Sequence, residues 1–409
     1  MLRGGQREKT HGLPILSKID DCPPRFLRLR RLMPTFAAYS AEIMGFIHQQ
    51  AGWPRFKWDA SSLSPLLADV RHSQGRLLGR MDGLGLPLRT QATLTTLTAD
   101  VTKSSAIEGE ILNQEQVRSS IARKLGLDVA GMVSSSRDID GIVEMMLDAT
   151  QKFQQPLTSD RLFAWQSALF PTGRSGLVRI TVGSWRTAES GPMQVVSGAM
   201  GRERVHFEAP AAERIPQEME RFLFWLEQDQ GLDPVLKAGI AHFWFVTIHP
   251  FEDGNGRIGR AIADLLLARS DGMAERFYSL SSQIETERKG YYEKLEACQR
   301  GGLDITVWLR WFLECFGRAI KGAEELLENV LRKARVWERI NQGPVNDRQR
   351  AVLNRLLDGF DGKLTSSKYS KLAKCSPDTA LRDIQDLVGR GIMLQSSSGG
   401  RSTSYELVD

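Results

Sequence analysis

The sequence predicts a mainly α-helical protein with one β-hairpin and a separate C-terminal module. Apolar residues recur at helical spacing over most of the chain, which indicates helices that bury one face. Residues 178–208 differ, because β-branched residues alternate with others on either side of a Ser-Gly-Pro break, as is typical of a hairpin. Gly343-Pro344 then reads as a linker before residues 346–409.

The helical runs follow in chain order. The spacing predicts helices over 61–78, 90–108, 111–153 with a Gly/Ser interruption at 131–136, 215–228, 234–248, 257–270, 286–300 and 305–340. In the C-terminal module, helices near 347–358, 366–373 and 377–389 precede a Gly/Ser-rich hairpin that reaches Tyr405. That order of elements resembles a winged helix.

The positive charge of the chain lies at its N-terminus. The 409 residues have a formal net charge of +5, and residues 1–35 hold eight basic and three acidic side chains, so the remainder is neutral. Residues 1–44 are rich in Arg, Gly and Pro without periodicity and are expected to form a disordered tail. Met33 and Met44 are plausible later starts, so it stays open whether residues 1–43 belong to the natural protein. The charge therefore does not predict a basic binding face on the folded part.

Other features narrow the class of protein. No apolar run approaches the roughly 20 residues that a membrane span needs, and the longest, 238–248, contains His242. The N-terminus lacks the apolar segment and cleavage site of a secretory signal. None of the four cysteines forms a CxxC pair, so we expect neither a zinc site nor a disulfide framework, and a reducing cytoplasm fits best.

The segment from His249 to Arg260 reads HPFEDGNGRIGR and lies between two helical runs. Residues 254–256 allow unusual backbone angles and can turn several N–H groups toward one point. The following helix adds its positive end. Arg257 and Arg260 are three residues apart and share one helix face, which completes a cradle for a polyphosphate.

Two further side chains in this segment favour catalysis. Asp253 is suited to hold a divalent cation that bridges phosphate oxygens. His249 has a reference pKa near 6.5, which suits the removal of a proton from an incoming hydroxyl. Together these residues predict phosphoryl or nucleotidyl transfer, in which catalysis is mostly positioning and charge stabilisation.

Rival interpretations explain less. Residues 254–259 also match GxGxxG, and 243–248 would then be the strand of a dinucleotide-binding unit. The preceding apolar run has helix length, however, and the chain lacks βαβ alternation. A plain polar loop with a helix cap accounts for the glycines but not for His249, Asp253 and the two arginines together.

The same residues carry a family resemblance. The segment matches the motif HxFx(D/E)GNGRxxR at every defined position and resembles the Fic family. The resemblance implies a helical Fic (Fido) core, ATP with Mg²⁺, and transfer of AMP to a Ser, Thr or Tyr hydroxyl of a target protein. The related Doc subgroup, which phosphorylates its target, usually has Lys at the position of Gly256, so Gly256 favours AMP transfer.

The resemblance implies a role for each motif residue. His249 corresponds to the catalytic base, Phe251 to a core anchor and Asp253 to the magnesium ligand. The expected nucleotide-binding residues are Gly254, Asn255, Gly256, Arg257, Gly259 and Arg260, the last as partner of the γ-phosphate.

A second match lies far upstream. Ser104 to Gly109 reads SSAIEG and resembles the inhibitory-helix motif (S/T)xxxE(G/N) of the family. In the family that glutamate, here Glu108, pairs with the last motif arginine, here Arg260, and blocks productive ATP binding. On its own Glu108 would be an ordinary solvated helix charge; beside the motif it is expected to inhibit, and a second role in removing AMP stays open.

Other segments have weaker resemblances. The hairpin at 178–208 resembles the flap that binds a target segment by strand addition, although Trp185 and Met193 fit hairpin core equally well. Tyr291 and Tyr292 lie at the usual distance for residues lining the nucleoside pocket, and helix packing explains them as well. His242 is interpreted as structural.

The predicted organisation has five parts. These are a disordered tail (1–44), an N-terminal helical module with the inhibitory helix (45–156), a Fic catalytic domain (157–320), a helix and linker (321–345) and a winged-helix-like module (346–409).

The C-terminal module raises an alternative function. A winged-helix transcriptional regulator whose Fic-like loop only binds nucleotide is the second hypothesis. Residues 344–409 hold ten basic and eight acidic residues, and the candidate recognition helix 377–389 carries Asp378, Asp383 and Asp386. Carboxylates there oppose contact with phosphates, so protein binding or dimer contacts are favoured over DNA.

Overall fold

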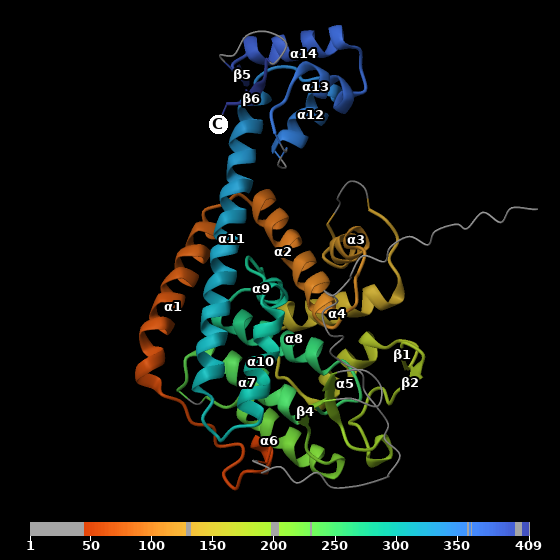
Figure 1. Cartoon of the computed structure of the whole chain (residues 1–409), viewed down its shortest axis with the longest axis vertical. Coiled ribbons are helices and arrows are strands. Elements are labelled where there is room, and N and C mark those ends of the chain that lie inside the picture. Colours follow the sequence, from red (N-terminus) through yellow and green to blue (C-terminus); the bar gives the residue numbers. More distant parts are fainter. Residues whose placement is uncertain are drawn as a thin grey trace, which may run out of the picture.

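The computed structural model confirms the mainly α-helical class (Figure 1). The structure describes residues 45–127, 132–197, 204–229, 231–357, 360, 362–396 and 403–408. The tail predicted at 1–44 lies outside these residues. The short 3-10 helices are η1 (Ile47–Gln49), η2 (Ala188–Ser190) and η3 (Ala212–Arg214).

The N-terminal half begins with two long helices. Helix α1 (Ala60–Asp82) buries Leu63, Val70 and Leu77, which recur every seven residues and face α11 (Thr306–Ile340). Helix α2 (Leu86–Ile107) packs against α9 (Leu280–Thr286), which in turn contacts α11.

The next helices are shorter than the predicted run 111–153. Helices α3 (Gln114–Lys124) and α4 (Arg137–Gln151) begin at the side-chain caps Asn113 and Ser136. Helix α5 (Ser159–Leu169) was not predicted, because few of its positions are apolar and buried. It begins at Thr158, whose hydroxyl accepts a hydrogen bond from the Arg161 N–H.

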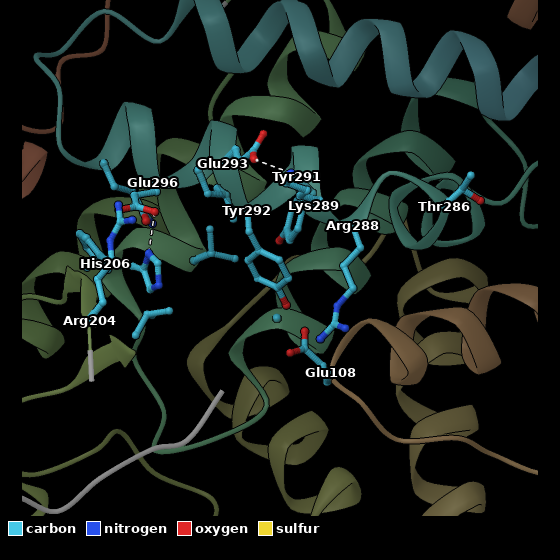
Figure 2. A pocket seen from close by; sticks show the side chains of 16 residues that line it. Glu108, Arg204, His206, Thr286, Arg288, Lys289, Tyr291, Tyr292, Glu293 and Glu296 are labelled. Carbon is cyan, nitrogen blue, oxygen red and sulfur yellow. Dashed lines mark hydrogen bonds and ion pairs between the residues drawn. The ribbon is translucent and has the colours of Figure 1, made fainter. Parts of the chain in front are cut away.

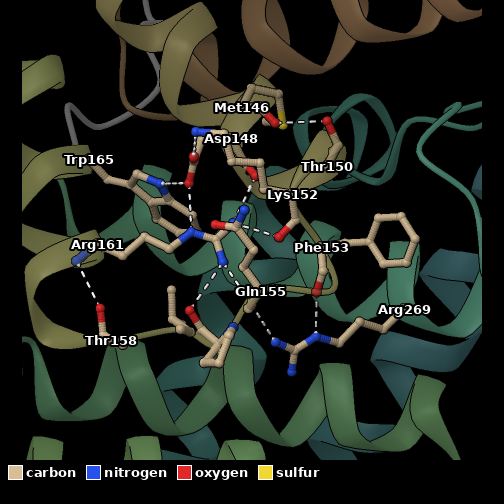
Figure 3. A network of polar contacts seen from close by, with 12 residues as sticks. Met146, Asp148, Thr150, Lys152, Phe153, Gln155, Thr158, Arg161, Trp165 and Arg269 are labelled. Atoms are coloured by element: carbon tan, nitrogen blue, oxygen red, sulfur yellow. Dashed lines mark hydrogen bonds and ion pairs between the residues drawn. The ribbon is translucent and has the colours of Figure 1, made fainter.

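A polar network ties these helices to helix α8 (Asn255–Asp271) (Figure 3). Asp148 of α4 accepts hydrogen bonds from Arg161 (2.6 Å) and Trp165 (2.7 Å) of α5. Arg269, from the last turn of α8, donates to the Phe153 carbonyl at 2.7 Å. The segment between α4 and α5 is therefore fixed to α8 by its own backbone carbonyls.

Helices α7 (Pro234–Ile248) and α8 (Asn255–Asp271) form the centre of the molecule. A Cβ added at Gly259 would lie 2.8 Å from a Val246 methyl group, so the glycine lets the two helices approach closely. Helices α6 (Ile215–Glu227) and α10 (Arg288–Gln299) surround them, and α7 is buried along almost its whole length. Residues 249–254, the first half of the HPFEDGNGRIGR segment, link α7 to α8, and its second half forms the start of α8.

The strands form separate hairpins instead of the single hairpin expected over 178–208. Strand β1 (Arg174–Ser175) pairs with β2 (Val178–Arg179), and β3 (Gln194–Ser197) pairs antiparallel with β4 (Arg204–Glu208). After β2 the backbone bonds to side chains: Gln166 donates to the Thr181 carbonyl and accepts from the Gly183 N–H. The alternating Val178–Val182 pattern therefore does not continue as a strand.

The C-terminal module has its own core. Helices α12 (Asp347–Leu357), α13 (Ser366–Ala373) and α14 (Pro377–Gly389) precede β5 (Met393–Gln395) and β6 (Tyr405–Leu407), in the order predicted. The resemblance to a winged helix stays a prediction. Val336 and Ile340, at the end of α11, pack into this core, whereas α11 residues up to Leu331 pack on the main body. Within the described residues, no helix combines the length and apolarity that a membrane crossing needs.

Candidate active site

His249 ends α7 in a strained conformation. Its φ of 53° and ψ of 60° are left-handed, which is uncommon for a residue with a side chain. The backbone is held because the His249 N–H donates to Phe245 O at 3.0 Å and Arg186 Nε donates to His249 O at 2.8 Å. Such strain persists where the surrounding structure enforces it, as is common at functional sites.

The environment of the His249 ring prepares a neutral base. Nδ1 lies 3.3 Å from the Val246 carbonyl, which only accepts, so Nδ1 carries the proton and Nε2 keeps its lone pair. Burial, followed by the charge of Arg186, lowers the pKa of His249 to about 4. The imidazole is therefore neutral at neutral pH and able to accept a proton.

Two buried residues brace the loop that follows. Phe251 is fully buried and packs against Trp185 and Phe163, in agreement with its place as a core anchor. The Asn255 side chain accepts from the Phe251 N–H at 3.0 Å and donates to the Phe251 carbonyl at 2.8 Å. The Asn255 amide thus fixes the turn, and Gly254 between them has a φ of 89°.

The structure brings Ser104 and Glu108 onto Arg260. Arg260, 1% exposed, donates from Nε to Ser104 Oγ and from Nη2 to the Ser104 carbonyl, each at 2.9 Å. Nη2 also lies 2.7 Å from Glu108 Oε1. Among the described residues, the buried Nη1 has no hydrogen-bond partner. The sequence pattern that joined these three residues therefore corresponds to direct contacts.

Gly256 is what allows Glu108 to reach this position. A Cβ at residue 256 would lie 2.0 Å from Glu108 Oε1 and 3.2 Å from Arg260 Nη1. Any side chain there would displace the carboxylate.

Arg257 meets two groups that the sequence did not single out. Its Nη1 lies 2.8 Å from Glu110 Oε2, and its guanidinium lies 5.1 Å from the centre of the Phe170 ring. Nε of Arg257 is buried without a hydrogen-bond partner in the described part of the chain. Nothing in the motif pointed to Glu110 or Phe170, because both lie outside it.

Asp253 is held in place by two hydrogen bonds. It accepts hydrogen bonds from the Ser175 hydroxyl of β1 and, at 2.6 Å, from the Gly254 N–H. In the residues described, no three His, Cys, Asp or Glu side chains cluster as a preformed metal cage. A single carboxylate still fits Mg²⁺, which is usually bound by one or two carboxylates together with substrate phosphates. The unpartnered donors of Arg257 and Arg260 fit those phosphates.

A cavity of about 690 Å³ lies beside the loop (Figure 2). Glu108 and Gly256 line it from the turn after α2 and from α8, and Val195 and Phe207 line it from the β3–β4 hairpin. In Figure 2 the side chains of Arg288, Tyr292 and Glu108 converge at one end of it. The size suits a small ligand such as a nucleotide.

The two tyrosines differ in their surroundings, although both line this cavity. Tyr291 is 2% exposed, and its hydroxyl lies 2.9 Å from Nε2 of His242. His242 stacks on Trp308, and burial lowers its pKa to about 3, which agrees with a structural histidine. A nucleoside contact by Tyr291 or Tyr292 stays a prediction.

Three further expected residues lie in packed positions. Gly259 faces α7 and not the cavity, so its contact is with Val246, and a contact with nucleotide stays a prediction. Met193 is buried beside Phe207, and Trp185 packs on Phe251. Both therefore contribute to packing around the hairpin and the loop.

The β3–β4 hairpin is held against α10 by charged groups that the sequence did not indicate. Glu296 of α10 lies 2.6 Å from His206 Nδ1 and 2.9 Å from an Arg204 nitrogen. Arg300 donates to the carbonyls of Val205 and His206. These contacts fix the wall of the cavity that the hairpin forms.

Comparison with known proteins assigns two segments of the chain. Residues 46–127 match a domain of unknown function (DUF4172), and residues 156–267 match the Fic/DOC family. The first segment contains the turn at Glu108, and the second contains the loop from His249 to Arg260.

The chain is similar to curated proteins over part of its length. It is 28% identical over 200 residues to protein adenylyltransferase fic-1 of Caenorhabditis elegans, which covers 48% of this chain and 36% of that protein. It is 37% identical over 99 residues to protein adenylyltransferase Fic of Drosophila mojavensis, covering 24% of this chain and 18% of that protein. The chain thus spans about a third or less of these relatives.

Solved structures of Fic proteins are similar as well. A Fic family protein from Desulfovibrio desulfuricans is 23% identical, with a TM-score of 0.48 over 84% of this chain and 96% of that chain. Fic-1 from C. elegans (residues 134–508) is 21% identical, with a TM-score of 0.46 over 66% of this chain and 76% of that chain. The match to the family model, which spans the HPFEDGNGRIGR loop, shows that this chain carries a Fic/DOC family domain at residues 156–267.

Proposed function

We propose that this protein is a protein adenylyltransferase that transfers AMP from Mg-ATP to a hydroxyl of a target protein. The observation that carries the proposal is the loop itself. It joins a neutral His249, a partly buried carboxylate at Asp253 and two buried arginines, each with one N–H group that has no partner among the described residues. The names of the similar curated proteins support the same activity.

The chemistry follows from the positions of these groups. The target hydroxyl gives its proton to His249 Nε2 as its oxygen bonds to the α-phosphorus of ATP, and the bond to pyrophosphate breaks. Arg257, Arg260 and the N-terminus of α8 stabilise the negative charge of the phosphates. Mg²⁺ held by Asp253 would neutralise charge on the phosphate oxygens.

Glu108 is proposed to inhibit this reaction. Its carboxylate accepts from Nη2 of Arg260, and the Ser104 hydroxyl accepts from Nε. An arginine held in this way is not available to the γ-phosphate, so ATP lies in an unproductive pose.

The target is proposed to bind at the hairpin. Strand β3 pairs only with β4 among the described residues, so its outer edge can accept a further strand from a target segment. A Ser, Thr or Tyr hydroxyl on that segment would face His249. Self-modification, a homodimer and DNA binding by the C-terminal module stay predictions, as does a cytoplasmic location.

Radiolabelled ATP tests the reaction. With label on the α-phosphate, the purified protein is expected to label itself or a partner, and His249→Ala is expected to abolish the label because the base is lost. The Glu108→Gly variant is the suitable background, since its brake is removed. Transfer of label from the γ-phosphate instead would identify a kinase and overturn AMP transfer.

Inhibition by Glu108 is tested separately. Glu108→Gly is expected to raise AMP transfer at least tenfold, equivalent to about 1.4 kcal/mol, because Arg260 is released. Adding Arg260→Ala is expected to remove the gain, since the released group is then absent. Incubating pre-labelled target without ATP separates faster transfer from slower removal of AMP. Unchanged forward and reverse rates would show that Glu108 is not a brake.

A further inference from the structure

We propose that Glu110 is a second inhibitory carboxylate, which occupies Arg257 as Glu108 occupies Arg260. This inference rests on the proposed function and extends it to a residue outside both motifs. Arg257 Nη1 lies 2.8 Å from Glu110 Oε2, and the two side chains come from segments 147 residues apart in the chain. Glu110 acts through Arg257 and is therefore a positioning residue.

The turn after α2 delivers both carboxylates at once. The Glu108 and Glu110 N–H groups both donate to the Ser105 carbonyl at 3.0 Å, which closes the end of the helix. Gly109 between them has a φ of 88°, a conformation that favours glycine. The residues on either side of Gly109 therefore face two arginines that lie three residues apart on one face of α8.

Arg257 has few other ways to satisfy its charge. Its side chain is 4% exposed, and its guanidinium lies over the Phe170 ring at 5.1 Å. Its Nε has no hydrogen-bond partner in the part of the chain described. A phosphate would supply the acceptors that this buried cation lacks, so Glu110 and a phosphate compete for the same guanidinium.

The inhibitory effects of Glu108 and Glu110 are expected to differ in size. Glu108 is 14% exposed, whereas Glu110 is 50% exposed and is more strongly screened by water and salt. Glu110 is thus expected to weaken nucleotide binding by about threefold to fivefold, less than the effect of Glu108. Removing both carboxylates is expected to give more than removing Glu108 alone, because each acts on a different arginine.

Nucleotide affinity tests the inference directly. We would measure the Kd of α,β-methylene-ATP with Mg²⁺ by calorimetry, starting from Glu108→Gly. Adding Glu110→Gln is expected to tighten binding by about threefold to fivefold at low salt, and the gain is expected to shrink in 0.5 M NaCl. Glu115→Gln removes the same charge from an exposed position in α3 and is the matched control, expected to leave the Kd unchanged.

A double-mutant cycle shows whether Glu110 acts through Arg257. With Arg257→Gln present, Glu110→Gln is expected to lose its effect, because the partner is gone. An unchanged or weaker affinity on Glu110→Gln, or an equal gain on Glu115→Gln, would overturn the inference. A gain in affinity without any AMP transfer would support it and overturn the proposed function, whereas Glu108→Gly protein that binds no nucleotide would overturn both.

Discussion

At the residue scale, His249 illustrates how packing prepares a side chain for chemistry. Its left-handed backbone places the ring in a buried position, where its Nδ1 finds only a carbonyl and where Arg186 adds positive charge. Burial and the charge of Arg186 disfavour the imidazolium, and they outweigh the Val246 carbonyl, which favours it. The residue type alone predicts a pKa near 6.5, so this preparation is a property of the fold.

The shifted pKa predicts the pH dependence of AMP transfer. Because the pKa of His249 is lowered to about 4, the base stays neutral from pH 5.5 to 7.5, and kcat/KM is expected to stay flat over this range. A histidine with the usual pKa near 6.5 would instead lose roughly tenfold by pH 5.5. The measurement is kcat/KM of the Glu108→Gly variant at saturating Mg²⁺, with circular dichroism at each pH as the control for folding. An acidic midpoint near 6.5 would contradict this environment for His249.

At the element scale, helix α2 is anchored by a buried acid. Asp100 is fully buried, and its Oδ1 accepts from the Ser279 hydroxyl at 2.5 Å. Asp264 of α8 and Arg276 lie close by, and Arg276 binds Asp264 at 2.9 Å. Oδ2 of Asp100 and Oδ2 of Asp264 are both without hydrogen-bond partners in the described residues. Burial, followed by the charge of Asp264, raises the pKa of Asp100 well above its usual range, which favours the protonated carboxyl.

The raised pKa predicts how the stability of this contact changes with pH. A group that binds its proton more tightly when folded stabilises the protein at low pH, and this stability is lost as pH rises toward the folded-state pKa. Asp100→Asn keeps a neutral side chain at every pH, so its melting temperature relative to wild type is expected to rise from pH 5 to pH 8. Each kcal/mol corresponds to very roughly 2–4 °C.

Paired thermal melts at pH 5, 6, 7 and 8 check this expectation. Asp69→Asn, on the exposed face of α1, is the matched control and should show no such trend. If Asp100→Asn lost stability equally at all four pH values, Asp100 would instead be an ionised partner of Arg276.

At the scale of the whole molecule, the protein has two separate hydrophobic cores joined by α11. The core of the catalytic body includes α11 residues as far as Leu327, and the C-terminal core begins at Val336. The intervening turns of one continuous helix connect the modules. Damage to one core is therefore expected to leave the other folded.

Leu387→Ala tests this independence. Leu387 of α14 is fully buried in the C-terminal core, and its truncation is expected to cost about 2–5 kcal/mol there. In calorimetry only the transition of the C-terminal module should shift, and AMP transfer by the Glu108→Gly background should stay within twofold. Leu267→Ala, in the core of the catalytic body, is the comparison and should shift the other transition. A large loss of AMP transfer in Leu387→Ala would show that the C-terminal module controls the active site.

Most of the helices and the HPFEDGNGRIGR segment could be recognised from the sequence alone. Helical periodicity predicted most of the helices, because a buried face leaves a repeat that needs no knowledge of its partner. The HPFEDGNGRIGR segment could be recognised in the same way, because its glycines, histidine and arginines all lie within one turn and the start of one helix. Helix α5 could not be predicted, because its few buried positions leave no clear helical repeat in the sequence.

Which groups far apart in the chain come into contact followed from tertiary packing. Glu110 reaches Arg257 across 147 residues, and Ser175 reaches Asp253 across 78. The strand that begins at Val178 is shorter than predicted, because the Gln166 side chain of α5 makes hydrogen bonds to backbone groups that a longer strand would have paired with a neighbouring strand. A local sequence pattern cannot predict such pairings, because it does not show whether the partner of a polar side chain is water or a buried cation. The lowered pKa of His249 has the same origin, since burial and Arg186 exist only in the folded chain.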